Sequence, residues 1–509
     1  MPFHAVKDLR PAVNPDSLQI LTRTSRFLID EGVPAYLVGG FVRDMLLDRD
    51  TADIDIAVAS DALATASGAA DTLGGRYVRL EDRLGRVIFP ETGWHIDFTT
   101  LEGGIEQDLA RRDFTIDAMA FELDKALETS FDEASMIDPY HGHKDLLDKK
   151  VRAVRNTVFR EDAVRLVRAM RIASELGFDI DAATEDLMRR DAALIAGVAG
   201  ERVREELLRL LALPGAGRRL AHLGELGLLT ALVPELSPTR GVDQPVVHVW
   251  DVYQHSIQTV AALEYVLHEE DWDHADPGVL AMVPWSERLG HHFDREVGHG
   301  STRRTLLKLS ALLHDIAKPQ TKATDADGRT RFLGHPQEGA AVAAAVLERL
   351  RFSNREIQLV ELLVRYHLRP TQMGQEGEAP TRRAIYRYFR DLGDAGLDLL
   401  FLSLADHLAT RARTLDMEQW RQHTTLTAFV LENRFAETPA APPRLIDGDD
   451  IITVFGLSPG PRIGELLEAV REARAAGEIT ERQQALDYIR DLIDKQGPVA
   501  HTRPSQGEK

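Results

Sequence analysis

The hydrophobic periodicity of the sequence changes near residue 150, and this change most constrains the fold. Before it, short apolar runs with the two-residue period of β-strands alternate with helical segments; the strand-like runs are AYLVGG, DIDIAV, RVIFP and WHIDFTT. After it, most of the sequence has the period of amphipathic helices, as in ERVREELLRLLAL. We therefore expect an α/β head, a mixed sheet with helices, followed by a mainly α-helical body.

Length and breaks in periodicity divide the chain further. At 509 residues it exceeds what one hydrophobic core usually serves. The stretch 265–302 has the scattered His, Asp, Gly and Pro residues of a loop or insertion, and AETPAAPPR at 436–444 is typical of a linker. The parts that we expect are a helical lead-in (1–27), the head (28–150), a helical neck (151–240), a second helical domain (241–420) and a linker with a small helical tail (421–509).

Composition excludes several classes of protein. No stretch approaches the ~20 apolar residues that a membrane span needs, and the N-terminal MPFHAVKDLR lacks the apolar segment of an export signal. The chain has no cysteine, so a bound metal must be held by His, Asp or Glu. We expect a cytoplasmic protein with no membrane partner.

Charge limits any contact with nucleic acid to a local surface. With 61 basic and 81 acidic residues, the net charge of -20 argues against broad adhesion to RNA or DNA. The stretch 152–171 is locally basic, because six arginines stand against only Glu161 and Asp162. It is either an RNA-binding surface or a solvated helix face. The arginines are Arg152, Arg155, Arg160, Arg165, Arg168 and Arg171.

The segment AYLVGGFVRDMLL predicts a strand, a tight turn at Gly39 and Gly40, and a helix that begins near Phe41. Glycines let the backbone approach phosphate oxygens, and a helix N-terminus offers free N–H groups. Arg43 could add positive charge. The turn is suited to a triphosphate, although such turns are also common without a ligand.

The segment ADIDIAV predicts a metal-binding strand. Alternate residues of a strand share a face, so Asp53 and Asp55 point one way while Ile54 and Ile56 point into the core. Paired carboxylates can hold the two divalent cations of nucleotidyl transfer, and Asp97 in WHIDFTT is the natural third carboxylate. A lone D-x-D is more often a solvated strand end; the upstream turn and Asp97 favour the metal site.

Two further segments offer contacts to a nucleotide. In RRDFTIDAMAFEL, Arg111 and Arg112 could clamp phosphates, and Asp113 could accept a hydrogen bond from a ribose hydroxyl. In EDAVR, we expect Asp162 and Arg165 to lie three apart on one helical face. A carboxylate and a guanidinium together match the Watson-Crick edges of cytosine and adenine, but not those of uracil or guanine. Local ion pairs on surface helices are the alternatives.

In this order, the segments resemble the class II tRNA nucleotidyltransferase and poly(A) polymerase family over roughly residues 25–235. LVGGFVRDMLL with DIDIAV looks like its first motif, and RRDFTIDAMA like its second. FREDAVRLVRAMRIASELGF looks like its base-templating helix and ERVREELLRLL like its neck motif. The resemblance implies a head with a polymerase-beta-like mixed sheet. One departure stands out: the family usually has Asn where this chain has Asp117, which adds negative charge near the second motif.

The resemblance also implies roles for single residues. It implies that Asp53 and Asp55 bind Mg²⁺. Phosphate and ribose contacts carry over to Gly39, Gly40, Arg43, Asp44, Arg111, Arg112 and Asp113. Base recognition carries over to Glu161, Asp162 and Arg165, with Arg168 one turn further along.

The second half contains HVWDVYQHS, LLHDIAKP, GHPQEGA, RYHLRP and LADHLA. Imidazoles and carboxylates together suit a divalent transition metal or magnesium. This pattern resembles the HD metal-dependent phosphohydrolase superfamily over about residues 245–415. We expect one metal ion on His255, His314, Asp315 and Asp406, with His335 and His367 as ligands of a possible second ion, and Ni²⁺, Mn²⁺ or Co²⁺ preferred over Ca²⁺.

The segment from RLIDGDD to ALDYI resembles the C-terminal part of bacterial CCA-adding enzymes. We expect it to contact the tRNA body or pack on the HD domain. Poly(A) polymerases of the family typically end in a basic extension, whereas this sequence ends HTRPSQGEK.

The expected function is untemplated transfer of CMP and AMP from CTP and ATP to the 3′ end of tRNA, with HD-dependent phosphohydrolysis beside it. A CC-adding, A-adding or poly(A)-adding specificity uses the same residues and stays open. Alternatives of other kinds are an HD phosphohydrolase with an RNA-binding N-terminal half, and a non-catalytic RNA-binding module. The sequence does not predict the oligomeric state.

Overall fold

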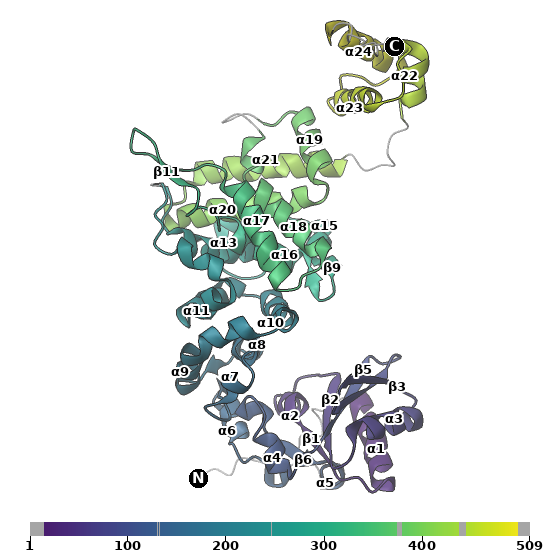
Figure 1. Cartoon of the computed structure of the whole chain (residues 1–509), viewed down its shortest axis with the longest axis vertical. Helices are drawn as coiled ribbons and strands as arrows, with labels where there is room; N and C mark the ends of the chain where they lie inside the picture. Colours follow the sequence, from purple (N-terminus) through teal and green to yellow (C-terminus); the bar gives the residue numbers. More distant parts are fainter. Residues whose placement is uncertain are drawn as a thin grey trace, which may run out of the picture. The chain divides into compact units, whose positions relative to one another are not determined.

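Two compact units make up the chain in the computed structural model (Figure 1). The first runs to Leu213 and includes Arg219–Pro234; the second comprises Pro214–Arg218 and the chain from Glu235 onward. The start of the expected lead-in, most of the expected linker and the last residues of the tail lie outside the described residues. The structure describes residues 15–129, 131, 133–245, 247–373, 379–436 and 444–496.

A six-stranded mixed sheet forms the core of the head. Its strands are β1 (Ala35–Val38), β2 (Asp53–Val58), β3 (Arg76–Glu81), β4 (Leu84–Phe89), β5 (Trp94–Thr100) and β6 (Ala120–Glu122). Their order is β3-β4-β5-β2-β1-β6; β2 and β5 run parallel and the other neighbours antiparallel. Ile54 and Ile56 of β2 are fully buried, as the alternation predicted. The predicted runs AYLV, DIDIAV, RVIF and WHIDFTT all lie in strands of this sheet.

Helices surround this sheet and continue into the neck. Asp61 caps one of them, since its carboxylate accepts a hydrogen bond from the Leu63 backbone N–H at 2.9 Å. The helices of the head are α1 (Pro15–Asp30), α2 (Gly39–Leu46), α3 (Ala62–Leu73), α4 (Ile105–Leu109), α5 (Leu123–Thr129) and α6 (Gly142–Leu147). The following helices are α7 (Val158–Glu161), α8 (Arg165–Leu176), α9 (Ala182–Asp191), α10 (Gly200–Ala212), α11 (Ala216–Glu225) and α12 (Leu228–Leu232), with the short parallel pair β7 (Lys150–Val151) and β8 (Asp179–Ile180).

Five helices form the centre of the second unit. They are α13 (Val252–Val266), α16 (Arg303–Leu313), α17 (His335–Arg349), α18 (Asn354–Tyr366) and α20 (Ala395–Arg411). Helix α13 packs on α16 and α20, and α17 packs on α18. Helix α20 is apolar on nearly every side and buried along most of its length, as expected of a central core helix. Capping boxes at Thr302 and Ser353 begin α16 and α18.

Further elements complete this unit. Helices α19 (Arg382–Leu392) and α21 (Met417–Ala436) pack together, and β11 (Lys322–Thr324) pairs with β12 (Thr330–Phe332). The three last helices, α22 (Gly448–Phe455), α23 (Pro461–Ala475) and α24 (Arg482–Gln496), share a separate hydrophobic core around Ile451 and Ile489.

The expected α/β head followed by a mainly helical body is confirmed. The expectation of a loop at 265–302 is wrong in part, because that stretch contains α14 (Pro277–Leu280), α15 (Glu287–Asp294) and the pair β9 (Glu296–Gly298) and β10 (Ser301–Thr302). Aromatic anchoring explains the local order: Trp285 stacks on Phe293 with ring centres 6.1 Å apart. The five-part division of the chain stays a prediction.

No helix among the described residues is long and apolar enough to cross a membrane.

Candidate active site and metal centre

Three carboxylates lie together on the sheet of the head. Asp53 and Asp55 share a face of β2, and the parallel register places Asp97 of β5 beside Asp55. The same register places His95 beside Asp53, with His95 Nδ1 3.2 Å from Asp53 Oδ1. The fold therefore brings together the three acids that the sequence singled out.

The surroundings of Asp55 disfavour the charged form of its carboxylate. Burial raises its pKa to about 6, and the nearby carboxylates of Asp97, Asp117 and Asp53 add to the rise, while Arg112 partly offsets it. A carboxylate crowded by other carboxylates is one whose charged form a divalent cation would stabilise. Oxygen-only ligands fit Mg²⁺.

Asp97 differs from its neighbours because an arginine already holds it. Arg86 Nε and Nη2 donate to its two carboxylate oxygens at 2.6 and 2.7 Å. This bidentate pair fixes Asp97 and neutralises part of its charge. Asp53 and Asp55 are therefore the more available pair for a cation. Arg86 was not singled out from the sequence.

Gly39 is required by its closeness to this acidic group. Its φ is +69°, and a Cβ built there would lie 2.9 Å from Asp55 Oδ2 and 3.1 Å from Arg112 Nη1. Any other residue would be strained and would collide with a side chain of the site. Helix α2 begins at Gly39 itself, two residues earlier than the predicted start at Phe41. Gly40, next in the helix, would place a Cβ 3.4 Å from Arg43 Nη2.

Arg43 is saturated by carboxylates of this chain. Its Nη1 donates to Asp117 Oδ1 at 2.6 Å, and its Nε and Nη2 each donate to Asp44 at 3.0 Å. Asp117 is buried, and burial raises its pKa although Arg43 opposes the rise. The departure from the family's usual Asn thus places a second carboxylate on Arg43. Arg43 and Asp44 thus form an ion pair beside the site.

The residues of the second motif are also held in place. Arg112 is held by an acid of α4, since its Nη2 donates to Asp108 at 3.1 Å. Arg111 is half exposed and pairs with Glu102. Asp113 accepts a hydrogen bond from Arg168 Nη1 at 3.2 Å, which connects this motif to helix α8. Arg112 is therefore the less exposed of the two arginines, with 25% of its side chain accessible against 50% for Arg111.

The expectation that Asp162 and Arg165 share one helix is wrong. Helix α7 ends at Glu161, Asp162 is extended with φ -152° and ψ 101°, and α8 begins at Arg165. The two side chains still meet, with Arg165 Nε 3.9 Å from Asp162 Oδ2. The break has a physical reason: the Asp162 carboxylate accepts from the backbone N–H of Val164, so it competes with the helical ladder.

Arg165 carries an unsatisfied donor. Its Nη1 is buried and has no hydrogen-bond partner among the described residues, whereas its Nη2 donates to the backbone oxygen of Arg111 at 3.3 Å. A buried guanidinium N–H without an acceptor is costly, and a ring nitrogen of a base would satisfy it. The carboxylate of Glu161 is already paired with an arginine: the hydrogen bond from Arg155 lowers the pKa of Glu161 to about 2.

Helix α10 supplies two residues that the sequence analysis missed. Arg202 holds Asp162 through two hydrogen bonds of 3.0 and 2.7 Å, and Glu206 accepts from Arg168 at 2.8 Å. Arg202 and Glu206 stand four apart and so share one face of the helix. That spacing was visible in ERVREELLRLL, but nothing in the sequence showed which partners the face would meet.

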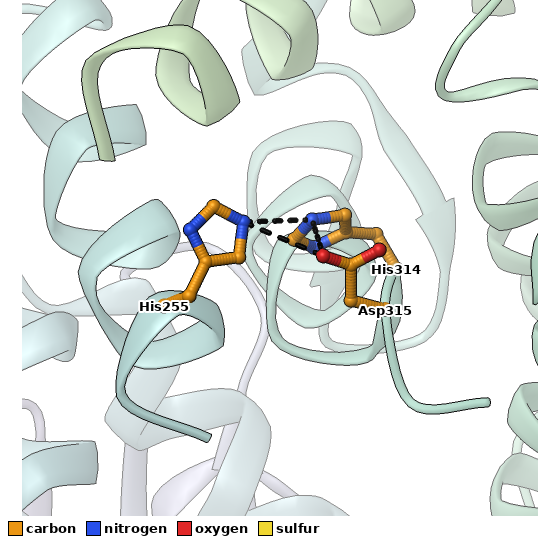
Figure 2. A group of neighbouring side chains, drawn as sticks. All are labelled: His255, His314 and Asp315. Atoms are coloured by element: carbon orange, nitrogen blue, oxygen red, sulfur yellow. Dashed lines mark hydrogen bonds and ion pairs between the residues drawn. The ribbon is translucent and has the colours of Figure 1, made fainter. Parts of the chain in front are cut away.

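The second unit gathers histidines and acids around Asp315, as Figure 2 shows for His255 and His314. His255 lies on α13, and His314 directly follows α16. His255 Nε2 is 3.3 Å from His314 Nε2 and 3.5 Å from Asp315 Oδ2, and His314 Nε2 is 3.1 Å from that same oxygen. Asp406 of α20 lies beside this set, with its Oδ1 3.1 Å from His255 Nε2.

A second set uses the other oxygen of Asp315. His335 Nε2 lies 3.3 Å from Asp315 Oδ1, and His367 Nε2 lies 3.8 Å from it. The two imidazole nitrogens are 3.3 Å apart. In each set the ligand atoms lie within 4.8 Å of one another. Asp315 therefore stands between two groups of ligand atoms, one for each carboxylate oxygen.

Backbone carbonyls orient three of the four imidazoles. The Nδ1 atoms of His314, His335 and His367 lie 2.8, 2.6 and 2.7 Å from carbonyl oxygens of Ala311, Phe332 and Val364. An Nδ1–H that donates to a carbonyl leaves Nε2 with a free lone pair, which is the tautomer that a metal needs. Each of these histidines thus turns Nε2 toward Asp315.

Charge and burial at this cluster also fit a metal. Burial lowers the pKa of His367 to about 3, which keeps that imidazole neutral. Both oxygens of Asp315 are buried without a hydrogen-bond partner among the described residues, although Lys318 Nζ lies 2.6 Å from Oδ2. Lys318 supplies one positive charge at Oδ2, while Oδ1 faces the imidazoles of His335 and His367. Four imidazoles and two carboxylates suit a divalent transition metal.

Known proteins resemble this chain in sequence and in fold. Three family models match: "Poly A polymerase head domain" over residues 35–104 and 95–152, "Probable RNA and SrmB- binding site of polymerase A" over 177–239, and "HD domain" over 252–411.

Two curated proteins match along most of their length. An A-adding tRNA nucleotidyltransferase of Deinococcus radiodurans is 35% identical over 89% of this chain and 94% of its own. A CC-adding tRNA nucleotidyltransferase of Thermus thermophilus is 32% identical over 89% of this chain and 93% of its own.

Among solved structures, the Thermotoga maritima CCA-adding enzyme in complex with tRNA matches with a TM-score of 0.61. It covers 96% of this chain and 100% of its own, at 21% identity. At that identity the match shows a shared fold.

Proposed function

The chain belongs to the tRNA nucleotidyltransferase and poly(A) polymerase family, and on that premise we propose that it transfers CMP and AMP from CTP and ATP to the 3′ end of tRNA. It is a nucleotidyltransferase by membership of this family. The observation that carries the proposal is the acidic group on β2 and β5, where Asp53 and Asp55 stand beside the glycine turn of Gly39.

Each residue of the head has a part in this proposal. Asp53 and Asp55 would hold Mg²⁺ ions, which when bound activate the attacking 3′-hydroxyl and neutralise the leaving pyrophosphate. Gly39 lets the backbone lie against Asp55, and Arg112 stands at the same point to meet the triphosphate. Arg111, which is half exposed, can turn from Glu102 to a phosphate.

Base selection falls to Asp162 and Arg165. The unsatisfied Nη1 of Arg165 would donate to a ring nitrogen, and Asp162 would accept from an exocyclic amine. Cytosine and adenine both offer this combination. Arg202 holds Asp162 from the other side and fixes the direction of its carboxylate, so the pair is positioned before the base enters.

A second candidate is a partial specificity, in which the enzyme adds either the CC or the final A of the CCA end. It is favoured by a specific observation: the relatives that match along nearly their whole length include one A-adding enzyme and three CC-adding enzymes. The test uses tRNA that lacks its 3′ end and tRNA that ends in CC, each with CTP, ATP or both, followed by sequencing of the products. CCA on the first substrate supports the full reaction, whereas addition that stops after CC, or that needs CC beforehand, assigns the partial one.

For the HD domain we propose metal-dependent hydrolysis of a phosphomonoester or a 2′,3′-cyclic phosphate. The buried Asp315, with one oxygen in each ligand set, supports it. Ni²⁺, Mn²⁺ or Co²⁺ held there would supply a water of lowered pKa. Such a reaction would restore the 3′-hydroxyl that nucleotide addition requires. Hydrolysis of 2′,3′-cyclic AMP with each metal tests it, and no turnover with any of them rejects it.

A further inference from the structure

A pocket of about 510 Å³ adjoins the second ligand set of the HD domain. Pro336 and Gln337, which follow the ligand His335, form part of its wall. Tyr366 and Leu368, which flank the ligand His367, form another part. The pocket is therefore built on the same short segments that carry two of the histidines.

Four arginines line this pocket, and they come from two elements. Arg365 and Arg369 stand at the end of α18 and just after it, and Arg383 and Arg387 stand on α19. Planar guanidinium groups that converge from separate elements are suited to bind phosphate oxygens. No step proposed above for the HD domain uses these four residues.

One donor of the pocket is unsatisfied. The Nε of Arg383 is buried and has no hydrogen-bond partner among the described residues. Burying a guanidinium N–H without an acceptor is costly, so the position favours a ligand that brings an oxygen. Arg383 therefore offers a donor that an oxygen of a ligand would satisfy.

Two carboxylates from the C-terminal part of the chain, Glu472 on α23 and Glu478 just after it, pair with two of these arginines. Arg387 donates to both oxygens of Glu472 on α23 at 3.0 and 2.7 Å, and Arg383 Nη2 donates to Glu478 at 2.8 Å. These pairs are partly exposed, and exposed ion pairs contribute little stability each. A phosphate can therefore compete with the two glutamates for the same guanidinium groups.

On the opposite wall, the arginines pair within the HD domain. Arg369 Nη2 lies 2.5 Å from Asp391, and Arg365 pairs with Glu361 in the same helix. This wall makes no ion pair with the last three helices among the described residues. Arg365 pairs within α18, whereas Arg369 shares Asp391 with Arg390, which in turn pairs with Glu472 of α23.

We propose that this pocket binds a backbone phosphate of the RNA strand whose 3′ end reaches the HD ligand cluster. The inference rests on the proposed HD function for the strand's position, and on the arginines and the unsatisfied Arg383 donor for its chemistry. The carboxylates of Glu472 and Glu478 accept the hydrogen bonds from Arg383 and Arg387 that the phosphate oxygens would accept. An RNA strand therefore binds more tightly when those glutamates lose their charge.

The experiment measures binding of a short fluorescein-labelled single-stranded RNA, ending in a 2′,3′-cyclic phosphate, to the full chain by fluorescence anisotropy. Arg365→Gln with Arg369→Gln should weaken binding about tenfold and lower the slope of log affinity against log salt by ~1.4, the value for two lost contacts to a single strand. Arg383→Gln with Arg387→Gln should do the same. Glu472→Gln with Glu478→Gln should strengthen binding. Arg355→Gln, an exposed arginine outside the pocket, is the control.

Inorganic phosphate and AMP, added as competitors, distinguish the source of the phosphate. Weak competition by both supports a strand phosphate, and strong competition by AMP assigns the pocket to a mononucleotide and overturns the proposal. Arginine variants that bind RNA as the Arg355→Gln control does also overturn it, as does a glutamate pair variant that weakens binding. If the predicted changes in affinity occur but no cyclic phosphate is hydrolysed, the pocket stands and the proposed hydrolysis fails.

Discussion

The acidic group of the head and the histidine cluster of the HD domain differ in the type of their ligands and in how exposed those ligands are. Asp53 is largely exposed, with 68% of its side chain accessible, and the site of the head consists mainly of carboxylates, with His95 beside Asp53. In the HD domain, His255, His314 and Asp315 are almost fully buried, and imidazoles dominate. The first site is open on one side, so substrate phosphates can complete its coordination. The second holds its ligands fixed before any ion arrives.

This difference has a chemical consequence. Mg²⁺ prefers oxygen ligands, keeps several waters and is usually shared with substrate phosphates, so an open carboxylate site exchanges it readily. A buried set of imidazoles holds a transition metal more tightly. Under the proposed function, ligand type and burial would keep the two kinds of metal apart.

The largest expected effect is the loss of one activity without the other. Asp53→Ala or Asp55→Ala should reduce incorporation of both CMP and AMP by at least roughly 10²–10³-fold, because charge stabilisation of the transition state is lost. Hydrolysis of 2′,3′-cyclic AMP should be unchanged. His314→Ala with Asp315→Ala should give the reverse pattern. Incorporation is measured with tRNA that lacks its 3′ end.

Asp71→Ala is the matched control for the head, since Asp71 is an exposed acid on α3. Near-normal incorporation by a folded Asp53→Ala or Asp55→Ala variant would remove these residues from the reaction. Loss of both activities in one variant would show that the two sites are not independent.

The next effect concerns metal content. Because both ligand sets share Asp315, Asp315→Ala should lower retained transition metal in both sets, whereas His367→Ala should affect the second set alone. We expect affinity to fall at least about tenfold in each affected set. Elemental analysis after dialysis measures this, with the exposed His291→Ala as control. Equal metal loss in Asp315→Ala and His367→Ala would contradict a shared carboxylate.

A smaller effect is expected at the base-reading pair. Arg165→Ala removes the donor that faces the base and should cost ~1–3 kcal/mol of discrimination against UTP and GTP. Overall incorporation should fall less than selectivity, because Arg165 lies outside the acidic group. Competition between CTP and UTP measures this, and Arg209→Ala, an exposed arginine of α10, is the control. Unchanged preference would leave Arg165 as a local ion-pair partner.

The sequence predicted the head better than it predicted the contacts within it. Strand alternation placed Asp53 and Asp55 on one face correctly, because the period of two follows from local geometry. Strands β3 and β6 lacked that signal: β3 is mostly exposed, and β6 has only three residues. The partners of Asp97 and Asp162 depend on residues distant in sequence, so neither Arg86 nor Arg202 could be inferred.

The HD domain shows the same limit. Its motifs indicated six ligands, and the structure groups five of them into two sets that share Asp315, with Asp406 beside the first. Which residues share a set depends on how α13, α16, α17 and α18 pack, and the spacing of motifs does not contain that information. The helix break at Asp162 was missed for another reason, since a side chain that competes with the backbone leaves no trace in the hydrophobic pattern.

The smallest expected effect is on the stability of the fold, and it depends on pH through the charge of Asp55. In the metal-free protein, burial and neighbouring acids raise the pKa of Asp55 to about 6, above its ordinary value of 3.8. The folded state then binds a proton that the unfolded state has lost, so Asp55 destabilises the fold above about pH 6 and has no such effect below its ordinary pKa. Asp55→Asn should therefore be more stable than wild type by about 1–3 kcal/mol near neutral pH in chelator. The difference should shrink as the pH falls through 6 and vanish near pH 4.

Thermal or urea unfolding across this range measures it, with Asp71→Asn as control. Added Mg²⁺ should stabilise wild type more than Asp55→Asn, because the cation replaces the proton; a difference independent of both pH and Mg²⁺ would mean that Asp55 does not carry the charge that a metal would neutralise.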